Sequence, residues 1–307
     1  MAKGNMRYAI AIDFGGTKIS GAVITDTGRI IKKIRQPTEL NKGKKHILKN
    51  IVAVIKDLHG TADKRISGIG ISMPGFIDDS GRVVFAGGTL SCLTGFNLKR
   101  YLALRTGLSV SIENDANTFA LAEATYGAGK GYRVVLGIIW GTGIGGGVVV
   151  NRRVLRGAFG AAGEFGHMVI DPTIKSGPRC GCGQRACLEM LSSGKNIARM
   201  YKRLGGKIRD ADVKSIYNSK ERIAKKVIGD AIQNLGLGLA TVVQVVNPEI
   251  IVIGGGVSKL PDEVYSQLKK ELKKYAMPIL TKDLRIVRHN ISDDAGILGA
   301  ASLVFSQ

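Results

Sequence analysis

The chain has 307 residues, and its 45 lysines and arginines outnumber its 24 aspartates and glutamates, which gives a formal net charge of +21. A hydrophobic fraction of 44% excludes a disordered chain. No apolar run reaches the roughly 18 residues that a membrane-spanning helix needs. The opening sequence MAKGNMRYAI contains no apolar signal region. We therefore expect a cytoplasmic protein that is not secreted and has no membrane partner.

The surplus of basic residues has two interpretations, a polyanionic partner or a strongly basic surface. The lysines and arginines are spread along the chain, as at Lys32, Lys33, Lys225 and Lys226, and form no single block. No aromatic residues interleave with them, as a platform that stacks on nucleic-acid bases requires. We favour the basic surface and expect no specific nucleic-acid partner, only weak adhesion that salt suppresses.

The first half of the chain predicts strands and helices in a mixed order. Apolar side chains recur at helical spacing between Ile47 and Leu58, whereas the strand segments are short apolar runs bounded by turn residues. The expected strands are 7–14, 19–25, 29–36, 68–72 and 109–113, and the expected helices are 44–58 and 115–126.

The second half repeats this order. Strands are expected at 133–140, 145–150, 152–155 and 249–253, and helices at 220–246 and 261–275. A last helix at 294–305 has a face of small residues and is expected to return to the first half of the chain. The repeat predicts an α/β fold of two domains with a central nucleotide cleft. The N-terminal domain takes 1–117 plus 294–307, and the C-terminal domain takes 118–293.

Glycine-rich turns follow three of these strands, at a position where α/β sheets bind nucleotides. The first turn belongs to Asp13-Phe-Gly-Gly-Thr-Lys18, the second to Gly141-Thr-Gly143 and the residues after it, and the third to Gly254-Gly-Gly256. Glycines let backbone N–H groups approach a phosphate, and Asp13 could hold Mg²⁺ through water. Each turn alone is also explained as a tight turn, but three at equivalent strand ends favour a nucleotide site.

The segment Glu113-Asn-Asp-Ala-Asn117 joins a strand to a helix. Its Asn and Asp are good helix caps, which is the purely structural interpretation. A carboxylate at this position beside a phosphate cleft could also accept the proton of an attacking hydroxyl. We predict that Asp115 is this base and that Glu113 is structural.

Three of the four cysteines, Cys180, Cys182 and Cys187, lie within eight residues, and His167 precedes them. Three thiolates and an imidazole form a tetrahedral donor set typical of structural zinc. Cys92 is left over and is expected to be a small buried side chain.

Together these motifs resemble the ROK family of sugar kinases and repressors (repressor, open reading frame, kinase), whose members have the actin-like, or hexokinase-like, ATPase fold. The resemblance covers nearly the whole chain. It is carried most specifically by Gly-Glu-Phe-Gly-His167 together with Cys180-Gly-Cys-Gly-Gln-Arg-Ala-Cys-Leu-Glu189. It implies a kinase that uses Mg²⁺ and ATP to phosphorylate the 6-hydroxyl of a hexose, and that forms a homodimer or a homotetramer.

The resemblance also implies roles for single residues. Asp115 would be the catalytic base, and His167 would contact sugar with one ring nitrogen and zinc with the other. The implied sugar-binding residues are Gly75, Asn114, Glu164, His167 and Glu189. The residues implied near ATP are Asp13, Gly15, Gly16, Thr17, Lys18, Gly141, Thr142 and Gly143 at the phosphates, with Gly255 and Gly256 beside the adenosine.

The sugar itself stays open. Many glucokinases of this family carry an asparagine that contacts sugar shortly before the base. The corresponding stretch here reads Phe85-Ala-Gly-Gly-Thr-Leu-Ser-Cys92 and contains no asparagine. Glucose is our first expectation. N-acetylglucosamine, N-acetylmannosamine or a β-glucoside is the alternative. A sugar-responsive regulator is a further alternative that the basic charge suggests, but the phosphate motif starts within 13 residues and leaves no preceding DNA-binding domain.

Overall fold

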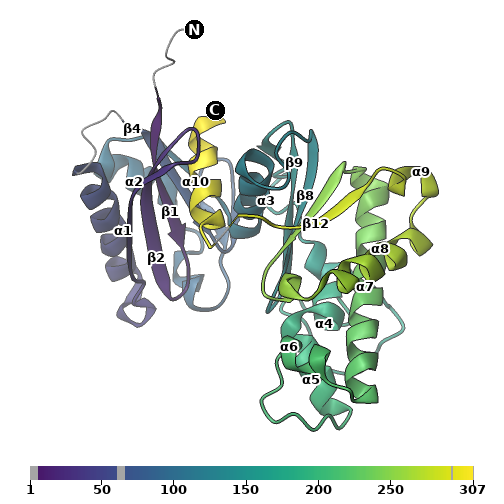
Figure 1. The fold of residues 1–307 in the computed structure, drawn as a ribbon. Coiled ribbons are helices and arrows are strands. Elements are labelled where there is room, and N and C mark those ends of the chain that lie inside the picture. Colours follow the sequence, from purple (N-terminus) through teal and green to yellow (C-terminus); the bar gives the residue numbers. More distant parts are fainter. Residues whose placement is uncertain (1–5, 61–65, 292, 307) are drawn as a thin grey trace. The chain divides into compact units, whose positions relative to one another are not determined.

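The computed structural model describes residues 6–60, 66–291 and 293–306, and it divides the chain into two compact units. The first unit comprises 1–131, 147–162 and 290–307, and the second comprises 132–146 and 163–289. Each is an α/β unit, and the chain as described contains two five-stranded sheets (Figure 1). No described helix is long and apolar enough to cross a membrane.

The first unit contains a sheet with the strand order β3-β2-β1-β4-β7. Strands β1, β2 and β3 are antiparallel neighbours, whereas β4 and β7 run parallel to β1. Its strands are β1 (Tyr8–Phe14), β2 (Lys18–Thr25), β3 (Ile30–Pro37), β4 (Ile66–Met73), β5 (Phe76–Ile77), β6 (Val83–Phe85), β7 (Val110–Asn114) and β10 (Arg153–Val154). Its helices are α1 (Gly43–Gly60), α2 (Leu98–Thr106), α3 (Asp115–Tyr126) and α10 (Ala295–Phe305), with 3₁₀ turns at Leu40–Lys42 and Gly88–Leu93.

Apolar side chains cover both faces of this sheet. Helices α1 and α2 bury one face in the larger core cluster of the unit, which includes Ile51 and Leu102. Helix α10 covers the other face, where Ala300 packs with Ala11 (Figure 1). Helix α10, the last helix of the chain, therefore packs against the sheet of the first unit.

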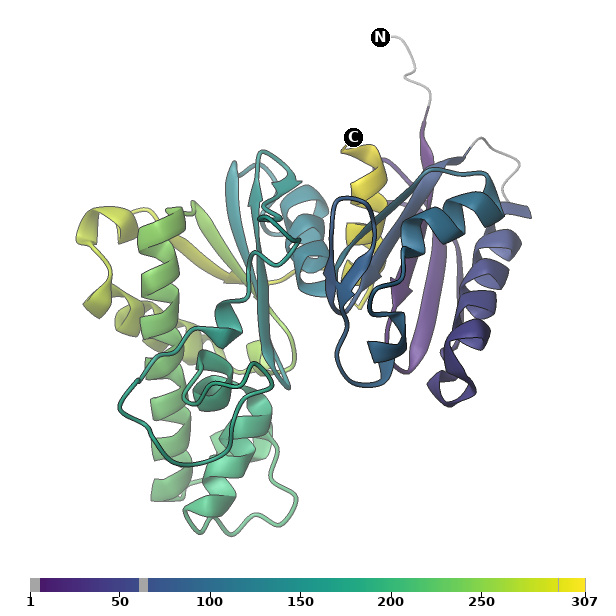
Figure 2. The same cartoon turned by 180° about the vertical axis from the view of Figure 1, so that it is seen from behind.

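Small residues on α10 are what allow its close approach. A Cβ added at Gly299 would lie 2.0 Å from the carbonyl oxygen of Thr118 in α3, and one added at Gly70 in β4 would lie 1.7 Å from that of Ala300. Because no side chain fits in these spaces, α10 packs backbone to backbone on β4 and α3. Figure 2 shows α10, in yellow, beside α3.

The second sheet has the order β10-β9-β8-β11-β12, which repeats the antiparallel and parallel pattern of the first. Strand β9 (Ile144–Val150) begins in the second unit and ends in the first. The other strands of the second unit are β8 (Val134–Trp140), β11 (Ile250–Gly254) and β12 (Arg285–Arg288). Its helices are α4 (Leu188–Ser192), α5 (Gly194–Arg203), α6 (Val213–Asn218), α7 (Arg222–Val246), α8 (Asp262–Tyr275) and α9 (Pro278–Thr281), with 3₁₀ turns at Phe165–His167 and Val257–Lys259.

Most predicted elements lie within two residues of an observed one, but the prediction for Cys92 is wrong. Its side chain is exposed at the end of the 3₁₀ turn Gly88–Leu93, where Leu90 and Leu93 occupy the interior instead. The sequence prediction also has no counterpart of the short β5–β6 hairpin, of α2, of α4 to α6, of α9 or of β12.

Candidate active site

The predicted base lies at the junction of β7 and α3. Asn114 caps the helix, because its side-chain oxygen accepts hydrogen bonds from the backbone N–H groups of Ala116 (2.8 Å) and Asn117 (3.3 Å). Its amide nitrogen donates to the carbonyl oxygen of Gly75 at 3.1 Å. The structure therefore brings together Gly75, Asn114 and Asp115, three of the predicted site residues.

Asp115 is the first residue of α3, and its side chain is accessible to solvent. The protein atoms around it remove enough hydration to raise the pKa of its carboxyl above 3.8, although the backbone N–H of Ala116 partly opposes this. A carboxylate with a raised pKa is a stronger base and can still be ionised at neutral pH. Asp115 therefore has the exposure and the chemistry that proton abstraction requires.

Asp13 is the penultimate residue of β1, just before the glycine turn that leads into β2. The backbone N–H of Gly15 donates to the carbonyl of Lys18 at 3.0 Å and closes this turn, in which Thr17 and Lys18 are exposed. Burial raises the pKa of Asp13, and the nearby carboxylate of Asp115 raises it further. Two carboxyl groups and an open phosphate-type turn thus meet in the first unit, and a divalent cation would relieve the repulsion between the two carboxylates.

Glu113, which we predicted to be structural, has a buried side chain that is only 1% exposed. One carboxylate oxygen accepts from the backbone N–H of Asn114 (2.8 Å) and from the side-chain amide of Asn117 (3.1 Å). The other lies 3.4 Å from Nε of Arg156. The pKa of Glu113 is raised by burial, and Arg156 is the largest influence that opposes the rise.

Arg156 was missed by the sequence analysis. Its guanidinium also donates to the backbone oxygens of Ile77 (2.7 Å) and Asp78 (3.4 Å), which follow Gly75 in the chain. Arg156 therefore connects Glu113 to the turn that receives the hydrogen bond from Asn114. No local signal marks Arg156, because its partners lie 43 and 79 residues away in the sequence.

The remaining predicted residues lie in the second unit, where the two glycine turns meet. A Cβ added at Gly255, whose φ is +88°, would lie 2.5 Å from the carbonyl oxygen of Trp140 and 3.0 Å from the backbone nitrogen of Gly141. Only glycine satisfies both this left-handed conformation and this close approach. Gly256 follows directly in the chain, and Thr142 and Gly143 continue the other turn, so these predicted nucleotide residues form one surface.

Glu189 lies on α4, where it contacts the same surface. Its carboxylate accepts a hydrogen bond from the backbone N–H of Ile144 at 3.0 Å, and a Cβ added at Gly143 would lie 2.5 Å from it. Glu164 precedes the 3₁₀ turn that carries His167, and its carboxylate lies 3.6 Å from Nε2 of that histidine. Glu164, His167 and Glu189 are thus all held in the second unit.

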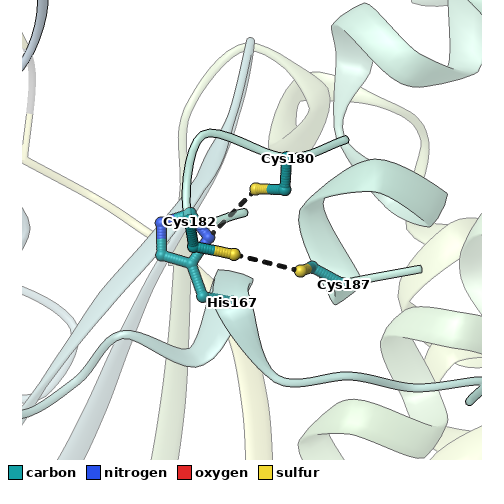
Figure 3. Close-up of side chains that lie close together, drawn as sticks. All are labelled: His167, Cys180, Cys182 and Cys187. Carbon is teal, nitrogen blue, oxygen red and sulfur yellow. Dashed lines mark hydrogen bonds between the residues drawn. The ribbon is translucent and has the colours of Figure 1, made fainter. Parts of the chain in front are cut away.

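The predicted zinc ligands converge on one point (Figure 3). The donor atoms of His167, Cys180, Cys182 and Cys187 all lie within 4.8 Å of one another. Sγ of Cys180 is 3.3 Å from Nδ1 of His167, and the sulfurs of Cys182 and Cys187 are 3.4 Å apart. Tetrahedral zinc, with Zn–S bonds of about 2.3 Å, would set its sulfur ligands about 3.8 Å apart. The donor set therefore fits a zinc ion with little adjustment.

The two ring nitrogens of His167 face different partners. Nδ1 faces the thiols, whereas Nε2 faces the carboxylate of Glu164. Burial, followed by the neighbouring thiols, raises the pKa of Cys187 to about 12. Because thiols this close together cannot all ionise without a cation between them, the site has the properties of a metal centre.

Comparison with known proteins places the chain among sugar kinases. The model of the ROK family matches residues 9–307. A glucokinase of Thermotoga maritima is 34% identical over 310 residues, which cover 96% of each chain. An N-acetyl-D-glucosamine kinase of Mannheimia succiniciproducens is 32% identical and covers 96% of this chain and 98% of its own. The solved structure of a ROK hexokinase from Thermus thermophilus matches with a TM-score of 0.84 at 31% identity, over 97% of this chain and 98% of that one.

Proposed function

Because the chain belongs to the ROK family and has its actin-like fold, we propose that it is a kinase that transfers the γ-phosphoryl group of ATP to the 6-hydroxyl of a hexose, with glucose as the first candidate. The similarity to a glucokinase over 96% of the chain supports this proposal. The observation that carries it is Asp115, an accessible carboxylate with a raised pKa beside Asn114 and the Asp13 turn.

The proposal assigns a role in phosphoryl transfer to each predicted site residue. The carboxylate of Asp115 accepts the proton of the sugar hydroxyl, which becomes the nucleophile. Asn114 and Gly75 orient the sugar, as do Glu164, His167 and Glu189. The turn from Gly15 to Lys18 and the turns at Gly141–Gly143 and Gly255–Gly256 hold the nucleotide through their backbone N–H groups. Asp13 would hold Mg²⁺, which would supply positive charge opposite the phosphate groups.

We propose zinc as the occupant of the cysteine–histidine site, with a structural role. A metal bond to Nδ1 of His167 would fix the tautomer of the ring, so that Nε2 is available to a sugar hydroxyl. The proximity of Glu164 to Nε2 supports this division of the two nitrogens. Zinc would thereby shape the sugar pocket from outside it.

N-acetylglucosamine is the second candidate substrate, supported by the 32% identity to an N-acetyl-D-glucosamine kinase. N-acetylmannosamine and β-glucosides remain in the same class of candidates, because all of these sugars present a 6-hydroxyl. The discriminating contacts surround the 2-substituent and the anomeric oxygen. A sugar-responsive regulator, the further alternative, is supported only by the basic net charge of the chain.

A release assay for ADP with Mg²⁺ and ATP over these sugars tests the proposal. We expect turnover with glucose or N-acetylglucosamine, abolished in Asp115→Asn and kept in Asp57→Asn, a matched control on the exposed side of α1. Direct titration with sugar should show that Asp115→Asn still binds it. Near wild-type turnover in Asp115→Asn would refute the assignment of the base, and no turnover of any sugar by the wild type would refute the kinase.

We further propose that the protein forms a homodimer or a homotetramer and acts in the cytoplasm. The cytoplasmic location is supported by the four free cysteines, because thiols in a metal site persist in a reducing compartment. Light scattering of the purified chain would measure the number of subunits.

A further inference from the structure

The β9–β10 hairpin presents two arginines that the kinase site does not use. Val150 pairs with Arg153, so that Asn151 and Arg152 form a two-residue turn. Both turn residues are left-handed, with φ of 52° and 61°. This is the turn in which Asn-Gly is favoured, and an arginine at its second position is strained by about 1 kcal/mol or more. Arg152 therefore occupies a turn position whose conformation favours glycine.

Arg152 and Arg153 both line an open cavity within the first unit. The cavity has a volume of about 310 Å³ and is lined by Arg7, Asp26, Arg152, Arg153 and Ser306, among others. Arg7 is already engaged, because its guanidinium lies 3.7 Å from Asp26 and donates to the carbonyl of Phe305 at 3.3 Å. Within residues 6–60, 66–291 and 293–306, the side chains of Arg152 and Arg153 form neither an ion pair nor a hydrogen bond. The cavity therefore has three cations and one carboxylate.

A second cavity of about 290 Å³ shares Arg152, Arg153 and Ser306 with the first. It extends to Lys99 and to Glu113. Its wall thus includes residues of β7 that directly precede Asn114 and the proposed base.

We propose that the cavity at Arg7, Arg152 and Arg153 binds a small phosphorylated molecule. Guanidinium groups match the geometry of phosphate oxygens and donate paired, charge-assisted hydrogen bonds to them. The first cavity takes the phosphate group, and its volume falls in the range of small-molecule sites. The adjoining cavity, which is also lined by carboxylates, accommodates the uncharged, hydroxyl-bearing remainder of the ligand. A nucleic acid is the less suitable occupant, because its repeating phosphates would meet Asp78 and Asp79 along that second cavity.

The test measures the binding of inorganic phosphate to tag-free protein by calorimetry at constant ionic strength set with KCl. Magnesium and a non-hydrolysable ATP analogue are present throughout, so that the nucleotide turns are filled. We compare the wild type with Arg152→Gln/Arg153→Gln and with Arg29→Gln/Arg100→Gln, a control that removes the same charge from exposed positions elsewhere in the unit. We expect phosphate affinity to fall at least about tenfold in the hairpin variant and to stay unchanged in the control.

Arg152→Gly is a second variant that separates binding from folding. It creates Asn-Gly in the left-handed turn and should raise the melting temperature, while phosphate binding weakens. Equal phosphate affinity in all four proteins would overturn the proposal. The proposal would also be overturned if inorganic phosphate did not bind and a single-stranded oligonucleotide bound through Arg152 and Arg153. Sugar turnover is measured in parallel, and its failure bears only on the proposed kinase activity.

Discussion

The contact between Glu113 and Arg156 allows a quantitative prediction for Arg156→Ala. Glu113 is 1% exposed, and Arg156 is the cation that faces its second carboxylate oxygen, at 3.4 Å. Removing one partner of a buried pair costs about 3–5 kcal/mol, since the remaining charge is left without compensation. The Arg156 side chain is 31% exposed, so water replaces part of its effect, and we expect about 3 kcal/mol, at the lower end of this range.

The loss should depend on pH with a definite sign. The pKa of Glu113 is already raised in the folded state, and without Arg156 it rises further. The folded state then loses stability as pH increases from the ordinary glutamate value of 4.5 through the raised pKa. The deficit of Arg156→Ala should therefore be largest at pH 7 and shrink towards pH 4.

Urea denaturation at pH 7 and pH 5 measures these free energies of unfolding. Glu113→Gln in the Arg156→Ala background removes the uncompensated charge and should recover a clear part of the loss. Arg153→Ala, on the same hairpin but exposed and unpaired, should change stability by less than about 0.5 kcal/mol. A cost below about 1 kcal/mol for Arg156→Ala, or no recovery in the double variant, would refute the reasoning.

Three further results are expected. The kcat/KM for the sugar should fall as pH drops through the raised pKa of Asp115, so the acidic limb of the pH–rate profile should lie above pH 3.8. A limb at or below pH 3.8 would contradict the conclusion that burial raises the pKa of Asp115. Cys187→Ser, or removal of the metal with a chelator, should raise the KM for sugar more than it lowers kcat. Atomic absorption measures the metal content of each sample. An unchanged KM in metal-free protein would exclude a role of the metal in shaping the sugar pocket. Gly70→Ala should lower the free energy of unfolding by at least about 1–3 kcal/mol in thermal denaturation, because its Cβ would lie 1.7 Å from the carbonyl oxygen of Ala300. The control Gly229→Ala, on the open face of α7, should be neutral or stabilising by up to about 1 kcal/mol. Equal effects of the two variants would argue against close packing of α10.

Features with a local physical cause could be predicted from the sequence. Apolar side chains at helical spacing between Ile47 and Leu58 predicted α1, and the segment with small residues near Gly299 was predicted to be a helix that returns to the first half of the chain. The clustering of Cys180, Cys182 and Cys187 predicted a metal site, because ligands near one another in the chain need little folding to meet. These patterns act over a few residues, so a single sequence contains them.

Other elements carry weak local signals. Strand β12 (Arg285–Arg288) begins and ends with arginines and has only two partly buried residues, so no apolar run marks it. Its position is decided by parallel pairing with β11, which is 35 residues earlier at Ile250↔Arg285. Cys92 was misplaced for a related reason, because a 3₁₀ turn buries Leu90 and Leu93 and leaves the cysteine outside.

The chain alone thus determined the two repeated α/β halves, the glycine turns and the identity of the chemical groups at the site. Only the tertiary structure decided that Arg156 faces Glu113, that Glu189 binds the N–H of Ile144, and that Arg7 shares a cavity with Arg152. Each of these contacts joins residues more than 40 positions apart. Their formation depends on how sheets and helices pack, because packing brings distant side chains together and removes the water that would otherwise solvate their charges.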